Sequence, residues 1–158
     1  ELDKLNIKYE LCPGVSSMFG AASALKAEFT PPEVSQSVII TRAAGRTPVP
    51  SSESIKSFAA HNATMVIFLS VGIIEKVRNE LIEGGYKTTT PAAIVYKATW
   101  PDEKIMITTV GELVESAKKN KIEKTALIIV GDFLKNTENK SKLYDRNFTH
   151  EYRKGESD

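Results

Sequence analysis

Two arginines, Arg42 and Arg46, lie close together in the segment Pro31–Pro50 and carry side chains suited to binding an anion. A short apolar run precedes Arg42, and two prolines stiffen the loop that follows Arg46. A guanidinium group binds a carboxylate or a phosphate through paired N–H donors. The pattern therefore indicates a strand that brings two cations to a rigid loop, with a polyanionic small molecule as the ligand. Plain surface charge is the alternative interpretation of the same two residues.

Three apolar runs end where backbone groups can meet a ligand. Strands are predicted over Thr64–Leu69, Ala92–Ala98 and Ala126–Val130. Ligands of open α/β sheets bind beyond the carboxyl ends of strands, so these ends are candidate ligand contacts. Lys97 stands beside this expected crevice. Ordinary strand termini remain the alternative.

Several common catalytic and binding motifs are missing. The segment Gly14-Val15-Ser16-Ser17 lacks the glycine that a serine nucleophile elbow places two residues after the serine, which favours a helix cap over a hydrolase. The two histidines and one cysteine are widely separated and do not indicate a metal site. Neither GxGxxG nor GxxxxGK[ST] occurs, so no glycine-rich phosphate loop is predicted.

Composition narrows the class of protein further. The chain has 158 residues, enough for one domain or two small ones, and 41% hydrophobic with 26% charged residues is ordinary for a soluble globular protein. A net charge of +1 argues against a nucleic-acid partner. No apolar run is long enough to span a membrane, and no signal peptide is found. The single cysteine, Cys12, fits a reducing cytoplasm.

The elements expected to position these residues alternate between strands and helices. The predicted strands cover 7–12, 36–41, 64–69, 92–98, 104–110 and 126–130, and the predicted helices cover 16–25, 51–62, 73–84 and 112–119. The pair 92–98 and 104–110 is expected to form a hairpin around the turn at Trp100-Pro101. This alternation predicts an α/β fold with a mixed sheet flanked by helices. A charged tail from residue 135 is expected to be mobile or docked on a partner.

Several stretches together resemble the tetrapyrrole (corrin/porphyrin) methylase family. They are Pro13–Ser17, Pro31–Pro50, Thr64–Ser70, Ala93–Glu103 and Ala126–Gly131, and the similarity extends over essentially the whole chain. The PGVSS and LIIVG segments are family-wide features. The segments TRAAGRTPVP, YKATWPDEK and SKLYDRNFTHEYR resemble the branch that methylates C-11 of precorrin-4 or of cobalt-precorrin-4.

The resemblance implies a two-domain enzyme, typically a homodimer, that binds S-adenosylmethionine in a cleft and methylates a tetrapyrrole in cobalamin biosynthesis. It also implies that 1–16 is a strand and hinge belonging to an absent N-terminal domain, 17–134 the C-terminal domain, and 135–158 the charged tail. On this interpretation the chain is a C-terminal fragment that is inactive alone. A methylase of another precorrin, and a non-catalytic tetrapyrrole-binding or dimerisation module, remain alternatives.

The family's functional residues correspond to positions in this chain. The implied cofactor contacts, several of them through backbone groups, are Ser16, Ser17, Leu69, Ala98, Ala126 and Leu127. Arg42 and Arg46 are the implied partners of the acetate and propionate carboxylates of the macrocycle, with Lys97 as a secondary candidate. No side chain is assigned to catalysis or to proton transfer.

Overall fold

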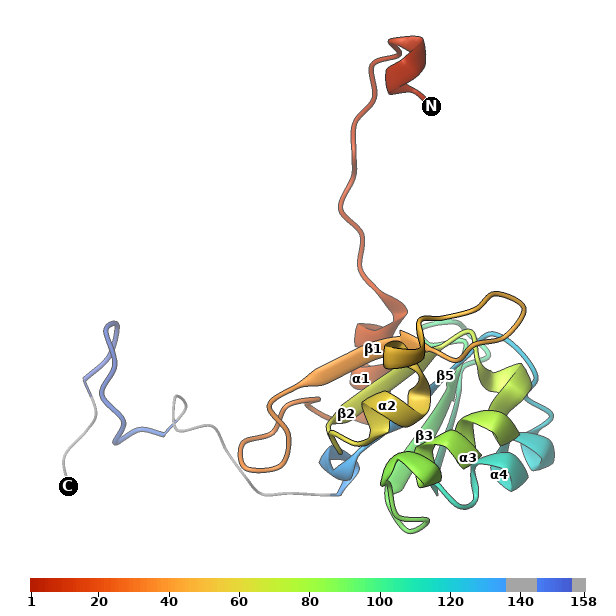
Figure 1. Cartoon of the computed structure of the whole chain (residues 1–158). Helices are drawn as coiled ribbons and strands as arrows, with labels where there is room; N and C mark the ends of the chain where they lie inside the picture. The colour runs from red at the N-terminus through yellow and green to blue at the C-terminus, as the bar shows by residue number, and fades with distance from the viewer. Residues whose placement is uncertain (136–144, 155–158) are drawn as a thin grey trace.

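A mixed sheet of five strands forms the centre of the computed structural model, which describes residues 1–135 and 145–154 (Figure 1). The strand order is β1-β2-β5-β3-β4. The strands are β1 Val38–Arg42, β2 Thr64–Phe68, β3 Pro91–Tyr96, β4 Lys104–Thr109 and β5 Ala126–Val130. The helices are α1 Ser17–Leu25, α2 Ile55–Ala59, α3 Ile74–Gly84 and α4 Leu113–Asn120, with 3-10 turns at Asp3–Leu5, Ser51–Glu53, Val71–Ile73 and Asp132–Leu134.

Strand β5 occupies the middle of the sheet and gives it its mixed character. It pairs antiparallel with β2 on one side and with β3 on the other, whereas β1 and β2 run parallel. Its residues Leu127–Val130 are all buried, as a strand covered on both faces requires. The apolar run of the sequence predicts this strand with the bounds that the structure has.

Helices cover the two faces of the sheet unequally. Helices α2, α3 and α4 pack on one face, where the apolar residues of α3 at helical spacing are fully or nearly buried (Figure 1). Helix α1 packs on the other face through Met18 and Ala21, against residues such as Val66 and Ile129. Phe29 and Phe133 close that second cluster with an edge-to-face contact at 5.4 Å between ring centroids.

The predicted fold class, the mixed sheet with flanking helices, is confirmed. The hairpin is also confirmed, because β3 and β4 pair antiparallel from Pro91–Thr109 to Tyr96–Lys104. The predicted helix over 51–62 is divided in two. Ser54 ends the first turn and caps α2, since its hydroxyl oxygen accepts a hydrogen bond from the Ser57 amide at 3.1 Å.

The strand predicted over 7–12 is absent from the structure. These residues are exposed and pair with no strand among the residues that the structure describes. A strand needs a partner for its backbone groups, and alternating side chains alone do not supply one. In the tail, residues 136–144 and 155–158 lie outside the described part. Residues 145–154 are described and contain a bridge between His150 and Arg153.

The described residues contain no helix that is both long enough and apolar enough to cross a membrane.

The packing of α3 against α2 predicts a strong effect of a small substitution. A Cβ atom added at Gly84 would lie 2.4 Å from the Lys56 carbonyl oxygen and 2.5 Å from the Ala59 Cβ. Because both obstacles belong to α2, Gly84→Ala must push the two helices apart. We expect it to lower the free energy of unfolding by about 1–3 kcal/mol in urea titrations.

Gly14→Ala is the matched control, because a Cβ atom there meets nothing within 4 Å. Its effect should stay within about 0.5 kcal/mol. Equal stabilities of the two variants would contradict the close packing of α2 and α3.

Candidate functional site

One edge of the sheet gathers most of the residues singled out from the sequence. Arg42 at the end of β1 is in register with Phe68 at the end of β2, and Tyr96 at the end of β3 is in register with Ala126. Because β5 runs antiparallel to β2 and β3, its first residue lies where those strands end. We call this end of the strands the ligand edge. It is formed by Arg42, Leu69, the loop 97–103 and Ala126. It is the edge at which α1 also begins (Figure 1).

The backbone at the ligand edge turns through left-handed conformations. Leu69, Lys97 and Thr99 have φ angles of 52°, 48° and 71°, which are unfavourable for residues other than glycine. Such conformations cost of order 1–3 kcal/mol each and persist only where surrounding contacts impose them. The Leu69 side chain is 87% exposed as a result of its turn.

Hydrogen bonds hold the loop 97–103 in this shape. The Lys97 amide donates to the Thr125 carbonyl at 2.9 Å, and the Thr99 amide donates to a Glu103 carboxylate oxygen at 2.7 Å. The Lys97 ammonium donates to Asp102 at 2.5 Å and lies 5.3 Å from the Trp100 ring centroid. This hydrogen bond raises the pKa of Lys97 and lowers the pKa of Asp102.

Lys97 is therefore engaged within its own loop. The carboxylates of Asp102 and Glu103 both bind groups of the same loop, and Asp102 is at the same time exposed to solvent. The spacing of these acids from Lys97 and Thr99 becomes meaningful only once the turn is known.

Helix α1 approaches the ligand edge closely. A Cβ atom added at Gly20 would lie 2.8 Å from Thr99 Cγ2 and 3.6 Å from the Ala98 Cβ, so only glycine fits there without displacement. Ser16 caps the helix, its hydroxyl oxygen accepting a hydrogen bond from the Met18 amide at 3.4 Å, and Ser17 is exposed beside it. The start of α1 and the Ala98 loop are thereby brought together.

The two predicted cofactor contacts on β5 differ in the exposure of their side chains. Ala126 is partly exposed at the ligand edge, whereas the Leu127 side chain is 6% exposed and packs in the cluster under α1. Leu127 can meet a ligand only through its backbone.

The two arginines have different environments. Arg42 donates to the carbonyl oxygens of Thr47 at 3.2 Å and Pro48 at 2.9 Å, so its guanidinium folds the loop 43–50 back onto β1. Arg46 is exposed within that loop. A cavity of about 390 Å³ lies beside Arg42 and is lined by Ile40, Thr41, Arg42, Pro48, Val49, Pro50, Glu53 and Phe68.

Ser70 also lies at this edge, although no role for it was predicted from the sequence. It is fully buried, accepts a hydrogen bond from the Ala43 amide at 2.8 Å, and donates to the Phe68 carbonyl at 2.6 Å. Its hydroxyl joins the ends of β1 and β2 and so fixes where the arginine loop begins. No local pattern distinguishes this serine from an ordinary turn residue.

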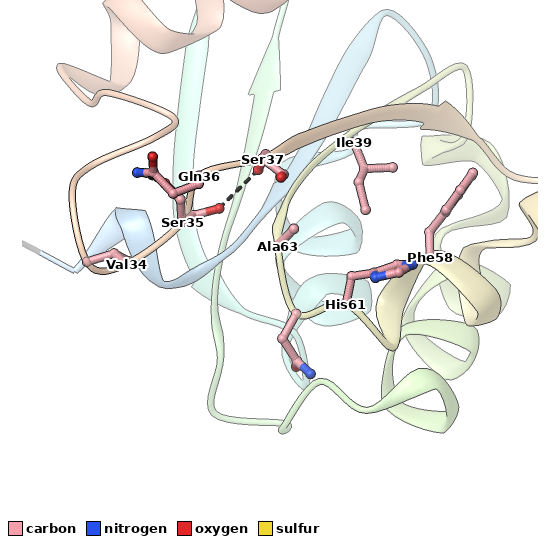
Figure 2. Close-up of a pocket in the computed structure, with 9 residues that line it drawn as sticks. Val34, Ser35, Gln36, Ser37, Ile39, Phe58, His61 and Ala63 are labelled. Atoms are coloured by element: carbon pink, nitrogen blue, oxygen red, sulfur yellow. Dashed lines mark hydrogen bonds between the residues drawn. The ribbon is translucent and has the colours of Figure 1, made fainter.

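A second cavity, of about 510 Å³, lies at the other end of the strands, where β1 and β2 begin. Figure 2 shows it between the segment leading into β1 and the end of α2, with Ile39, Phe58 and His61 on its walls. None of the cofactor or substrate contacts assigned from the family resemblance lines it. Among the described residues, moreover, no three His, Cys, Asp or Glu side chains are grouped as a metal site would need.

Comparison with known proteins decides the family. The family model described as Tetrapyrrole (Corrin/Porphyrin) Methylases matches residues 1–114, which is most of the chain. The chain belongs to the tetrapyrrole methylase family. The resemblance inferred from the sequence is thereby confirmed.

Related tetrapyrrole methylases share high identity with the chain. A cobalt-precorrin-4 C(11)-methyltransferase of Methanocaldococcus jannaschii is 56% identical over 155 residues, covering 98% of this chain and 60% of that protein. The protein of the same name from Priestia megaterium is 46% identical, covering 98% of this chain and 61% of that protein. The chain thus spans about 60% of the length of these relatives.

Solved structures agree on the fold of the tetrapyrrole methylase. A cobalt precorrin-4 methyltransferase, described as a cobalamin biosynthetic enzyme, superposes with a TM-score of 0.82 at 47% identity, covering 84% of this chain and 56% of that one. A uroporphyrin-III C-methyltransferase of Thermus thermophilus, complexed with S-adenosyl homocysteine, has a TM-score of 0.69 at 21% identity, covering 86% of this chain and 58% of that one.

The role of Ser70 at the ligand edge predicts a measurable loss of stability. Ser70→Ala leaves the buried Ala43 amide without its acceptor, and an unsatisfied buried donor costs about 1–3 kcal/mol. We expect a decrease of that size in the free energy of unfolding, measured by urea denaturation. Ser23→Ala, at an exposed position of α1, is the control and should change stability by no more than about 0.5 kcal/mol. Similar values for both variants would contradict the role assigned to Ser70.

Proposed function

We propose that this chain forms the C-terminal domain of an S-adenosylmethionine-dependent methyltransferase that acts on C-11 of cobalt-precorrin-4 or precorrin-4 in cobalamin biosynthesis. Residues 17–134 are the domain itself, 1–16 the hinge towards the remainder of the protein, and 135–158 a tail. The identity to the two cobalt-precorrin-4 C(11)-methyltransferases, 56% and 46% over 98% of the chain, is the observation that carries the proposal.

The ranking of the relatives favours the cobalt-containing substrate. A protein named precorrin-4 C(11)-methyltransferase, from a Sinorhizobium species, is 40% identical, below both relatives named for the cobalt substrate. Identity falls in the direction expected if this chain serves the cobalt-dependent form of the reaction.

The ligand edge fits the cofactor in its chemistry. Small residues, Ala98 and Ala126, leave room for a ligand to approach the backbone, and the left-handed turn at Leu69 directs backbone groups out of the sheet. We assign the cofactor contacts to Ser16, Ser17, Leu69, Ala98, Ala126 and Leu127, the last through its backbone. These are contacts that need neither a glycine-rich phosphate loop nor a metal.

The residues of this chain serve the reaction by holding the reactants. When bound, S-adenosylmethionine supplies an electrophilic methyl group on a sulfonium centre. The rigid loop 97–103 and the capped start of α1 keep their positions through their own hydrogen bonds, so they offer a preformed surface. Correct orientation of two reactants lowers a barrier by about 7–11 kcal/mol in favourable cases. The exposed Leu69 side chain adds an apolar surface from which a bound ligand excludes water.

Substrate binding is assigned to the arginine loop. The carboxylates of the macrocycle are the anions that a guanidinium binds best in a paired geometry. Arg42 holds the loop through Thr47 and Pro48 and lines the 390 Å³ cavity, while Arg46 projects from the loop. We therefore assign direct carboxylate binding to Arg46 and a combined binding and positioning role to Arg42. Lys97, paired with Asp102, is a secondary contact.

The proposal extends to assembly and location. The family resemblance supports a homodimer. The single, exposed cysteine supports a cytoplasmic location, because a free thiol suits a reducing compartment.

Substitution of the arginines tests the proposed function. In the complete protein, Arg46→Ala should raise KM for cobalt-precorrin-4 about 10- to 100-fold, because it removes a charged hydrogen bond worth about 1.5–3 kcal/mol. Affinity for S-adenosylhomocysteine, measured by calorimetry, should stay unchanged. Arg42→Ala should affect the same KM at least as strongly, because the loop loses its anchor as well.

Arg78→Ala on α3 is the matched control, since Arg78 interacts with Asn79 and Glu75 away from the ligand edge. It should leave both quantities at their wild-type values. An equal loss of substrate and cofactor binding in Arg46→Ala, or no loss of either, would contradict the assignment of Arg46.

A further inference from the structure

The loop 97–103 makes two successive turns, and the first of them contains a residue poorly suited to its place. The Trp100 amide donates to the Lys97 carbonyl at 3.0 Å and closes a four-residue turn. Ala98 and Thr99 are its two central residues. Thr99 has a φ angle of 71°, as the third residue of a type II turn does. Glycine is usual there, because a β-branched side chain such as that of threonine is strained at positive φ.

The alternative to this turn differs from it in the orientation of a single peptide unit. A type I turn has a negative φ at its third residue, which threonine adopts without strain, and rotating the central peptide by roughly half a revolution converts one type into the other. The rotation exchanges the directions of the Ala98 carbonyl and the Thr99 amide but leaves the side chains nearly in place. The approach of the Thr99 methyl group to α1 at Gly20 therefore does not decide between the two turns.

The Glu103 side chain binds only one of the two orientations. Its carboxylate accepts a hydrogen bond from the Thr99 amide at 2.7 Å, and hydrogen bonds to a charged acceptor are strong. The Glu103 backbone is itself fixed, because its amide donates to the Trp100 carbonyl at 3.0 Å. The next residue, Lys104, is in register with Tyr96 in the hairpin. In the type I orientation the Thr99 amide would point away from the carboxylate, and the hydrogen bond would be lost.

We infer that Glu103 is a positioning residue for cofactor binding, because its carboxylate fixes the orientation of the peptide unit between Ala98 and Thr99. The carbonyl and the amide of a trans peptide point in opposite directions, so the Ala98 carbonyl oxygen is directed away from Glu103. In the part of the chain that the structure describes, no group donates a hydrogen bond to that oxygen. It can accept one from a ligand, and its direction is set before the ligand binds.

This inference rests on the proposed function, in which Ala98 is a contact of S-adenosylmethionine. It adds a residue that acts through the backbone of that contact and does not itself touch the cofactor. It also accounts for a threonine in a left-handed conformation at the ligand edge, since the strained turn is the one that the carboxylate selects.

Calorimetric titration of the complete protein with S-adenosylhomocysteine tests the role of Glu103. Glu103→Ala should raise the Kd about tenfold, because the peptide unit is released when its charged acceptor is removed. Glu103→Gln keeps an oxygen acceptor and should stay within about threefold of the wild-type Kd. Glu115→Ala, at an exposed position of α4, is the matched control and should leave the Kd unchanged. Far-ultraviolet circular dichroism verifies that every variant is folded.

A second substitution distinguishes positioning from direct contact. Thr99→Gly removes the strain of the turn, because glycine adopts the required φ angle freely, and the type II turn then persists without the carboxylate. We therefore expect Glu103→Ala to change the Kd by no more than about threefold when it is combined with Thr99→Gly. If Glu103 touched the ligand directly, its loss would cost as much affinity in the Thr99→Gly background as in the wild-type protein.

Hydrogen exchange of the Thr99 amide tests the hydrogen bond without any ligand. Thr99 is exposed, so the Glu103 carboxylate should be the main protection of its amide. We expect Glu103→Ala to raise the exchange rate of this amide about tenfold. Glu115→Ala should leave the rate unchanged.

The outcomes separate this inference from the proposed function. An unprotected Thr99 amide in the wild-type protein, an unchanged Kd in Glu103→Ala, or a loss of affinity that Thr99→Gly does not restore would overturn the role of Glu103 and leave the proposed function in place. A wild-type protein with a protected Thr99 amide but no affinity for S-adenosylhomocysteine would overturn the proposed function, and the role of Glu103 in cofactor binding with it.

Discussion

The antiparallel insertion of β5 between β2 and β3 is the constraint on which the rest of the structure depends. It places apolar residues of β5, such as Ile128 and Ile129, in contact with both faces of the molecule, where they are fully buried. Full burial of a side chain of this size favours folding by about 1.5–3 kcal/mol. Because β5 reverses direction relative to its neighbours, its beginning lies level with the ends of β2 and β3. The ligand edge is a consequence of that reversal.

Rigidity at this edge comes from polar groups bound to one another. The Ser70 hydroxyl joins the ends of β1 and β2, Arg42 anchors the loop that follows, and Glu103 holds the Thr99 amide. These bonds keep left-handed residues in place that the chain would not adopt unaided. The methyl transfer proposed for this chain needs little covalent chemistry from protein side chains, so a surface fixed before binding is the contribution that we propose for the structure.

Local sequence patterns were sufficient wherever a segment's burial dictated its structure. Ala126–Val130 is a continuous apolar run, and both its strand and its bounds could be predicted. The alternating segment 7–12 failed the same test, because no partner strand lies beside it in the described structure. The strand order β1-β2-β5-β3-β4 was also beyond local patterns, since pairing between distant segments leaves no periodicity in either one.

The candidate site could be predicted from the sequence only in part. The family resemblance identified strand ends that the structure brings to one edge, including Leu69, Ala98 and Ala126. It did not indicate that Arg42 holds its own loop or that Asp102 binds Lys97, because both depend on the path of a turn. Side-chain chemistry could be inferred from the sequence, whereas the partner of each side chain required coordinates.

The most direct test of the account is a titration of the complete, ¹⁵N-labelled protein with S-adenosylhomocysteine, followed by the chemical shifts of the backbone amides. The account predicts that the amides of Leu69, Ala98 and Leu127, at the ligand edge, shift most and saturate together. Shifts concentrated instead around residues 35–37 and 61–63, which line the 510 Å³ cavity at the other end of the strands, would contradict it. An unchanged spectrum at millimolar ligand would contradict it equally.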